Sequence, residues 1–166
     1  MASFADAIPT ILGHEGGYVN VPGDRGGETN FGISSKTYPA LDIKGLTKDD
    51  AAGIYHSDFW NRYGLGEIHD QDIATYCLDC SVNHGPERGA KIAQRVANGF
   101  GAELQIDSAW GPNTRAALNG LPPDEALRGL IGERAAFFLA IVRGDPRQAK
   151  FIKGWLRRAF YPMGTP

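Results

Sequence analysis

The sequence has no long apolar segment. No run approaches the roughly 20 apolar residues that a membrane-spanning helix requires. The first residues, Met1 to Asp6, also lack the basic region and apolar stretch that mark a secretory signal. We therefore expect a chain that is synthesised in the cytoplasm and needs a separate release route to act outside it.

A strong charge of one sign is also missing. The 17 Lys and Arg residues nearly balance the 19 Asp and Glu residues, which gives a net charge of −2. This balance argues against general nucleic-acid binding. The charge is uneven, however, because residues 128–166 hold eight basic and two acidic side chains, a local charge of +6 against −8 elsewhere. Such a segment either attracts an anionic polymer or is a solvated helix face.

Cysteine is scarce, with only Cys77 and Cys80. Together with His84 they have a C-x₂-C-x₃-H spacing, which could supply three zinc ligands. A fourth ligand would have to be His69 or His56, since the sequence has no second paired motif. On a helix the side chains of Cys77, Cys80 and His84 share one face, so we favour a core stripe over a metal site. A disulfide is disfavoured in a chain without a secretory signal. We expect no metal and no cofactor.

Helical patterns cover most of the 166 residues. Thr47 and Asp50 have the spacing of a capping box, which predicts a helix that runs to Trp60. Further helices are expected from Asp70 or Asp72 to just before Gly85, from Pro86 through Val96, over 126–142 and over 147–161, with Asn113 or Thr114 as another helix cap. The chain length suits one compact unit.

Glu15 ends the first helical pattern. Apolar residues recur at helical spacing over 4–12, and on a helical wheel Glu15 falls within about 20° of Phe4 and Ile8. Burial and the negative end of the helix dipole both penalise the charged form of this carboxyl group. A carboxylic acid that keeps its proton is a candidate general acid. The alternative is a helix-end glutamate that turns out to solvent.

A turn-dense run over 19–33 follows Glu15 and interrupts the helical pattern. Its glycines and Pro22 cannot continue a helix, and glycine lets the backbone approach a ligand closely. Its small polar side chains, which could hydrogen-bond a hydroxyl-rich ligand, are Asn20, Asp24, Thr29 and Asn30. Apolar residues at both ends favour a packed β-hairpin that forms the wall of a cleft, with a flexible surface loop as the alternative.

The segment around Glu15 resembles a known family. The residues that carry the resemblance are His14-Glu15-Gly16-Gly17-Tyr18-Val19-Asn20, Pro22-Gly23-Asp24, Gly26-Gly27 and Thr29-Asn30-Phe31-Gly32-Ile33. They look like the N-terminal signature of glycoside hydrolase family 108, the phage-type N-acetylmuramidases. The resemblance implies that Glu15 is the catalytic acid. The family often has an aspartate where this chain has Val21, so Asp24 becomes the candidate for the second acidic role, with an Asx-turn residue as the alternative.

Two further segments extend the resemblance. Residues 79–85 look like a second block of the same family, in which Asp79 and Asn83 either face the cleft or tie the helix to its neighbour. Residues 93–119 are similar to the helical peptidoglycan-binding module that accompanies these hydrolases. Within that module, Trp110 either stacks on a sugar face or packs in the interior.

The sequence therefore predicts a mainly α, lysozyme-like fold with a small β-hairpin or loop element after the catalytic glutamate. We expect a lysozyme-like catalytic region over 1–85 and a peptidoglycan-binding-like helical region over 86–166, packed together as one unit. The implied activity is that of a peptidoglycan N-acetylmuramidase, which cleaves the β-1,4 bond between N-acetylmuramic acid and N-acetylglucosamine. The alternatives are a lytic transglycosylase and a non-catalytic wall-binding or secretion-accessory protein.

The expected catalytic residues are Glu15 and Asp24. The expected substrate-binding residues are Tyr18, Asn20, Thr29, Asn30, Asp79, Asn83 and Trp110. The expected partner is peptidoglycan, reached in the periplasm or cell wall after release by a holin, as for a phage endolysin or a holin-dependent export muramidase. We expect a monomer that binds no nucleic acid.

Overall fold

The computed structural model describes residues 1–20 and 27–163. Within these residues the fold is mainly helical with one small antiparallel hairpin, which confirms the predicted class. The helices are α1 (Phe4–His14), α2 (Lys48–Tyr55), α3 (Gln71–His84), α4 (Pro86–Gly99), α5 (Pro112–Asn119), α6 (Pro123–Gly144) and α7 (Ile152–Ala159). The strands are β1 (Thr29–Asn30) and β2 (Ile33–Ser34). None of the helices described is both long enough and apolar enough to cross a bilayer.

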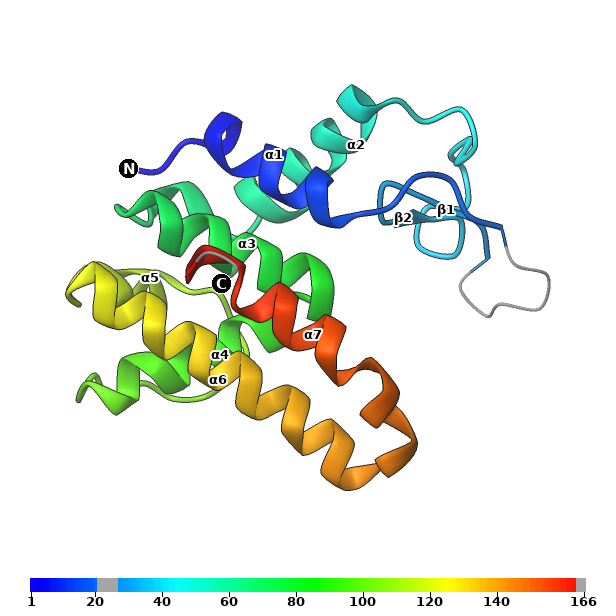
Figure 1. The fold of residues 1–166 in the computed structure, drawn as a ribbon. Coiled ribbons are helices and arrows are strands. Elements are labelled where there is room, and N and C mark those ends of the chain that lie inside the picture. Colours follow the sequence, from blue (N-terminus) through cyan, green and yellow to red (C-terminus); the bar gives the residue numbers. More distant parts are fainter. Residues whose placement is uncertain (21–26, 164–166) are drawn as a thin grey trace.

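Helix α3 is the centre of the fold. Figure 1 shows it between α1 and α2 on one side and α4, α6 and α7 on the other. Every residue from Ile73 to Ser81 is buried. The predicted core stripe with Cys77 and Cys80 is therefore confirmed, but burial extends around the whole helix because neighbours cover all of its faces.

The helix that follows Thr47 begins as predicted. The Thr47 hydroxyl accepts a hydrogen bond from the backbone N–H of Asp50, and the Asp50 carboxylate accepts one from the N–H of Thr47. After Tyr55 the chain winds more widely, as a π-helix over His56–Asn61. This winding places Tyr55 and Trp60, five residues apart, together in the core.

Helix α3 starts at a cap and ends at a sharp turn. Asp70 caps its start by accepting from the N–H of Ile73 at 3.0 Å. Gly85 ends the helix at φ +84°. Pro86 then starts α4 at a position where its missing N–H is not needed. The predicted break at Gly85-Pro86 is confirmed.

Two predictions about the later helices are wrong. Helix α5 is capped by Gly111 and starts at Pro112, so neither Asn113 nor Thr114 is its cap. The helix expected over 147–161 is divided into a 3₁₀-helix over Pro146–Phe151 and the α-helix α7. Because a 3₁₀-helix has three residues per turn, one helical wheel does not describe both parts, and Phe151 and Phe160 are exposed.

The hairpin after Glu15 is short and tight. Thr29 pairs with Ser34, Asn30 pairs with Ile33, and an isolated bridge joins Val19 to Thr29. The two turn residues, Phe31 and Gly32, both have positive φ, at 49° and 78°. Positive φ at both central residues is the geometry that matches the twist of a two-residue hairpin. The predicted packed hairpin is thus confirmed for the described part of this segment.

Candidate active site

Glu15 is the first residue after α1 and leaves the helix with an extended backbone, at φ −84° and ψ 135°. Its N–H still donates to the carbonyl oxygen of Ile11 at 3.1 Å. Of the predicted apolar stripe, Ile11 is fully buried and Phe4, Ile8 and Leu12 are half-buried, while Ala7 is buried as well. The Glu15 side chain is 17% exposed, so it lies inward while part of it remains accessible to a ligand.

The Glu15 carboxylate is paired with Arg158 of α7. Nη2 of Arg158 donates to Oε1 of Glu15 at 2.8 Å and to Oδ1 of Asp79 at 2.7 Å. The Nε–H of Arg158 also faces the Asp79 carboxylate, at 3.2 and 3.3 Å from its two oxygens. The guanidinium therefore bridges two carboxylates, one just after α1 and one in α3, which are 143 and 79 residues away in the sequence. The apolar pattern of the first helix gives no sign of this cation.

Asp79 is fully buried and has a second cationic partner, Arg134 of α6. Nη1 of Arg134 donates to Oδ2 of Asp79 at 2.6 Å, and both side chains are 0% exposed. Burial alone would raise the pKa of Asp79, but the hydrogen bonds and charges of Arg158 and Arg134 outweigh it and lower that pKa below its ordinary 3.8. Asp79 is thus a charged residue held between two guanidinium groups.

Arg134 connects this pair to the end of α3. Its Nε–H donates to Nε2 of His84 at 3.0 Å, and Nη2 donates to Oδ1 of Asn83 at 3.2 Å. Burial first, and then the positive charge of Arg134, lower the pKa of His84 to about 3. The neutral ring is required here, because Nε2 must accept a hydrogen bond.

The hairpin turn covers the other oxygen of Glu15. A Cβ atom on Gly32 would lie 2.6 Å from Oε2 of Glu15 and 2.5 Å from the hydroxyl of Tyr55. The Tyr55 hydroxyl donates to the carbonyl oxygen of Phe31 at 2.8 Å, and the N–H of Phe31 donates to the carbonyl oxygen of Gly16 at 3.1 Å. The absence of a side chain at Gly32 therefore makes room for the carboxylate against the turn.

Three predicted substrate-binding residues of the hairpin segment lie at the surface or partly so. The Tyr18 hydroxyl donates to Oε2 of Glu28 at 2.8 Å and accepts from Nδ2 of Asn20 at 3.4 Å. Tyr18 is 40% exposed, Asn20 is exposed and Thr29 is half-buried. Asn83 is also exposed, although its amide oxygen accepts from Arg134. Tyr18 and Asn20 are therefore accessible from solvent beside the hairpin, whereas Asn83 lies in the last turn of α3.

Three other predicted binding residues face the interior. Asn30 is 4% exposed and donates to the carbonyl oxygens of Ile43 and Leu46, so it holds the following loop. Asp79 ties helices together, which was the second of its two proposed roles. Trp110 is 8% exposed and packs in the core, so its indole does not present a stacking face. In this structure none of the three side chains is positioned to contact a sugar.

The second predicted carboxylate, Asp24, lies outside the described residues. Its separation from Glu15 therefore does not enter the geometry of the site. Among the described residues, Val19 and Thr29 form an isolated bridge, and the strand pair β1–β2 follows it.

The two cysteines are buried thiols of the core. Burial raises the pKa of Cys80 to about 12 and that of Cys77 well above its ordinary value. His84, the third residue of the C-x₂-C-x₃-H spacing, is bonded to Arg134. Over residues 1–20 and 27–163 no group of three or more His, Cys, Asp or Glu side chains is arranged to hold a metal ion.

Two hollows lie near the ion network. One, of about 480 Å³, is lined by Arg158 with His14, Gly154, Arg157 and Tyr161, and adjoins Glu15 through the Arg158 ion pair. The other, of about 260 Å³, is at the turn between α3 and α4.

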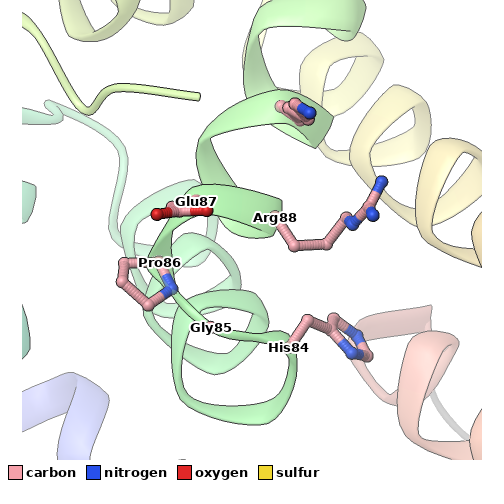
Figure 2. Close-up of a pocket in the computed structure, with 6 residues that line it drawn as sticks. His84, Gly85, Pro86, Glu87 and Arg88 are labelled. Carbon is pink, nitrogen blue, oxygen red and sulfur yellow. The ribbon is translucent and has the colours of Figure 1, made fainter. Parts of the chain in front are cut away.

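The hollow at the α3–α4 turn does not form a convergent binding site. Figure 2 shows His84 and Arg88 extending to one side of the turn, while Pro86 and Glu87 lie on the other. Arg88 packs over the ring of Phe137 at 4.5 Å, and His84 packs edge-on against the same ring. These side chains are occupied with α6, so the hollow does not compete with Glu15 as the candidate site.

Arg158, Arg134 and Tyr55 were not predicted as site residues. No local spacing could identify Arg158, because its partner Glu15 is 143 residues away. One indirect signal was present: an aspartate between Leu78 and Cys80, in a helix of buried residues, requires a cation from another element.

Two family models match the chain. The one described as Glycosyl hydrolase 108 matches residues 8–85, and the one described as Predicted Peptidoglycan domain matches residues 88–160. A solved structure titled "Structure of Brucella abortus SagA" is 30% identical, with a TM-score of 0.74, over 94% of this chain and 88% of that chain. No curated protein matches. The two matched ranges meet at the turn between α3 and α4.

Proposed function

Because this chain belongs to glycoside hydrolase family 108, we propose that it is an N-acetylmuramidase with Glu15 as the general acid. The family and the adjoining peptidoglycan domain make it a glycoside hydrolase of peptidoglycan. The proposed bond is the β-1,4 linkage between N-acetylmuramic acid and N-acetylglucosamine. The observation that carries the proposal is the partly accessible carboxyl group of Glu15, held between the hairpin turn and α7.

The chemistry requires two groups. Cleavage of a glycosidic bond needs a proton for the leaving oxygen and stabilisation of an oxocarbenium-like centre, usually from a second carboxylate. Glu15 would supply the proton. We assign the second role to Asp24, nine residues later on the hairpin segment, where it would activate water or stabilise positive charge. Tyr18, Asn20, Thr29 and Asn83 are the proposed substrate contacts.

The first test is Glu15→Gln on purified peptidoglycan. The amide keeps the shape of the side chain and cannot donate the proton, so the rate should fall by about 10²–10⁴-fold with the melting temperature retained within a few degrees. Release of reducing ends measures the rate. A variant that keeps more than about a tenth of the wild-type rate would exclude Glu15 as the acid.

The products separate the alternatives. Mass spectrometry of the digest should show reducing muramyl ends, whereas a lytic transglycosylase leaves anhydro-muramyl ends. A non-catalytic wall-binding protein would pellet with peptidoglycan and release neither product. Asp79 is buried, so Asp79 is not suited to replace Glu15 as the proton donor.

Asp24→Asn tests the second carboxylate. If Asp24 positions water or stabilises charge, turnover should fall at least tenfold with little change in melting temperature. If Asp24 only builds the turn, the melting temperature should fall and low-temperature activity should survive. Measuring both quantities on the same variant distinguishes the two roles.

We also propose that the enzyme is a monomer that reaches the wall after release by a holin, as a phage endolysin or an export muramidase does. The peptidoglycan domain matched over 88–160 supports the cell wall as the place where the enzyme acts. Turbidity of cells that express the wild type or Glu15→Gln tests this release route. Gram-negative cells that express the wild-type chain should lyse only after chloroform opens the inner membrane. Lysis without chloroform would contradict a holin-dependent route.

A further inference from the structure

We propose that Arg158 is a positioning residue for the catalytic acid, supplied to the active site by the C-terminal half of the chain. This inference rests on the proposed role of Glu15. The range matched by the peptidoglycan-domain model, 88–160, includes Arg158, whereas Glu15 and Asp79 lie within the range matched by the hydrolase model. The C-terminal helices would therefore complete the catalytic site, in addition to any role in wall binding.

The first argument is the geometry of the guanidinium group. A single nitrogen, Nη2, is 2.8 Å from Oε1 of Glu15 and 2.7 Å from Oδ1 of Asp79. The Nε–H also faces Asp79, so the planar group is oriented by two of its nitrogens. The N–H donors of a guanidinium group have fixed directions, so the group orients its acceptors as well as supplying positive charge. Rotation of Arg158 away from Glu15 would break its hydrogen bonds to Asp79.

The second argument is the rigidity of Asp79 itself. Asp79 and Arg134 are both 0% exposed and their closest atoms are 2.6 Å apart, while Arg158 is 16% exposed. The four groups alternate in charge from Glu15 through Arg158 and Asp79 to Arg134. Only the Glu15 end approaches the surface and the proposed substrate. The buried end thus anchors the end at which the chemistry takes place.

The third argument is the charge that forms during the reaction. When Glu15 gives its proton to the leaving oxygen, its carboxyl group becomes negative, and the guanidinium at 2.8 Å stabilises that charge. Asp79 pairs with the same guanidinium, so the positive charge of Arg158 is shared between two carboxylates.

Burial shifts the pKa values of two titratable groups near Glu15 in the direction that favours their neutral forms. Burial, and then the Glu15 charge, raise the pKa of Tyr55 on α2 well above its ordinary value. Burial lowers the pKa of His14 on α1 below 6.5. Arg134 on α6 is charged but pairs with Asp79. Among the described residues, Arg158 is therefore the charged side chain that contacts Glu15 directly.

The test compares Arg158→Gln, Arg158→Lys and Arg62→Gln on soluble, uncross-linked glycan strands. Arg62 is exposed at the end of the π-helix, so Arg62→Gln is a control that makes the same charge change outside the network. For each variant, kcat and KM are measured across pH, together with the melting temperature.

For Arg158→Gln we expect kcat to fall by at least about tenfold, with a smaller change in KM. The alkaline limb of the kcat profile should move to higher pH, because the cation that stabilises the carboxylate is gone. Arg158→Lys retains the charge but not the fork, so its kcat should be intermediate and its alkaline limb close to that of the wild type. Arg62→Gln should match the wild type in both respects.

Two results would overturn the inference. One is a wild-type kcat and an unmoved alkaline limb in Arg158→Gln, whatever its melting temperature. The other is an equal loss of kcat in both Arg158 variants with neither limb moved, which indicates a purely structural role. If Arg158→Gln does not fold, the lysine variant decides: a wild-type kcat in Arg158→Lys would also overturn it.

The failure of this inference differs from the failure of the proposed function. If the wild type releases no reducing ends, or if Glu15→Gln keeps its rate, the proposed function fails and Arg158 has no acid to position. If the wild type is active and Glu15→Gln is not, the Arg158 variants test the positioning role alone.

Discussion

His84 shows how one side chain at the end of the ion network makes the fold sensitive to acid. Its Nε2 atom accepts from Arg134 at 3.0 Å, so a second proton on the ring would remove an acceptor and place two positive charges in contact. Burial and the Arg134 charge lower the pKa of His84 from 6.5 to about 3. The folded protein therefore holds the His84 ring in its uncharged form.

We expect His84 to destabilise the protein as the pH falls from 6.5 towards 3. In this window the unfolded chain binds a proton that the folded chain excludes, so stability is full above 6.5 and is lost progressively below it. His84→Gln keeps an acceptor for Arg134 and does not titrate. Its melting temperature should therefore fall less between pH 7.5 and pH 4.5 than that of the wild type.

The exposed His69 provides the control for this experiment. His69→Gln should show the same acid-induced fall as the wild type. Asp79 does not affect the comparison, because it is present in all three proteins and the stability that its lowered pKa removes on acidification is common to them. An identical fall in the wild type and in His84→Gln would show that His84 does not couple stability to pH.

The packing of α3 against α4 depends on a position without a side chain. Gly89 of α4 is buried, and a Cβ atom there would lie 2.6 Å from the hydroxyl of Ser81 and 3.2 Å from its backbone nitrogen. The Ser81 hydroxyl cannot turn away without losing its hydrogen bond to the carbonyl oxygen of Cys77 at 2.8 Å. The two helix backbones therefore approach closely at this point.

Gly89→Ala should lower the free energy of unfolding by about 1–3 kcal/mol, because the added methyl group forces the helices apart. Gly132→Ala in α6 is the matched control, since nothing lies within 4 Å of a Cβ atom at that position. That change should stabilise the chain by about 0.4–1 kcal/mol through its effect on the unfolded state. Urea unfolding measures both, and equal effects of the two substitutions would contradict the close approach.

Elements with local signals were predictable from the sequence. The Thr47 capping box, the Asp70 cap and the break at Gly85-Pro86 each depend on neighbouring residues and occur as expected. The 3₁₀ segment before α7 was not predicted, because apolar spacing does not distinguish a three-residue turn from a 3.6-residue turn over a few residues.

The candidate site was predictable only in part, for a related reason. Glu15 could be proposed from the sequence because its helix pattern and glycine neighbours are adjacent to it. Asn30 and Asp79 were predicted as substrate contacts, but each binds a partner that the sequence separates from it, Ile43 in one case and Arg134 in the other. Residue type indicated that these groups were polar and important, and only the tertiary structure shows what they contact.

A buried ion pair connects the two halves of the molecule, which are the ranges 8–85 and 88–160 matched by the two family models. Helix α3, from the hydrolase range, packs against α4 and α6 from the peptidoglycan-domain range, and Asp79 pairs with Arg134 across that boundary. Removing one partner of such a pair leaves an unpaired buried charge, which typically costs about 3–5 kcal/mol. The halves are therefore energetically coupled, and the basic segment 128–166 cannot be treated as an independent surface.

That segment has fewer surface charges than its composition indicates. Of its eight basic residues, Arg134 is fully buried and Arg158 is 16% exposed within the ion network, while Arg147 pairs with Asp145 at 2.8 Å. Arg128, Arg143, Lys150, Lys153 and Arg157 remain to attract an anionic wall polymer. Any steering by this face should thus depend on a modest number of charges.

We expect the rate on whole peptidoglycan to fall as salt rises from 0.1 M to 1 M, because the Debye length shrinks from about 10 Å to about 3 Å. Hydrolysis of a short neutral chito-oligosaccharide should hardly respond, since attraction to an anionic polymer plays no part in its binding. Replacing Lys150 and Lys153 with glutamine should reduce the salt dependence on whole wall without changing the rate on the oligosaccharide. Equal salt sensitivity on both substrates would leave the segment as a solvated helix face, because a general effect of salt on the enzyme would then explain the loss.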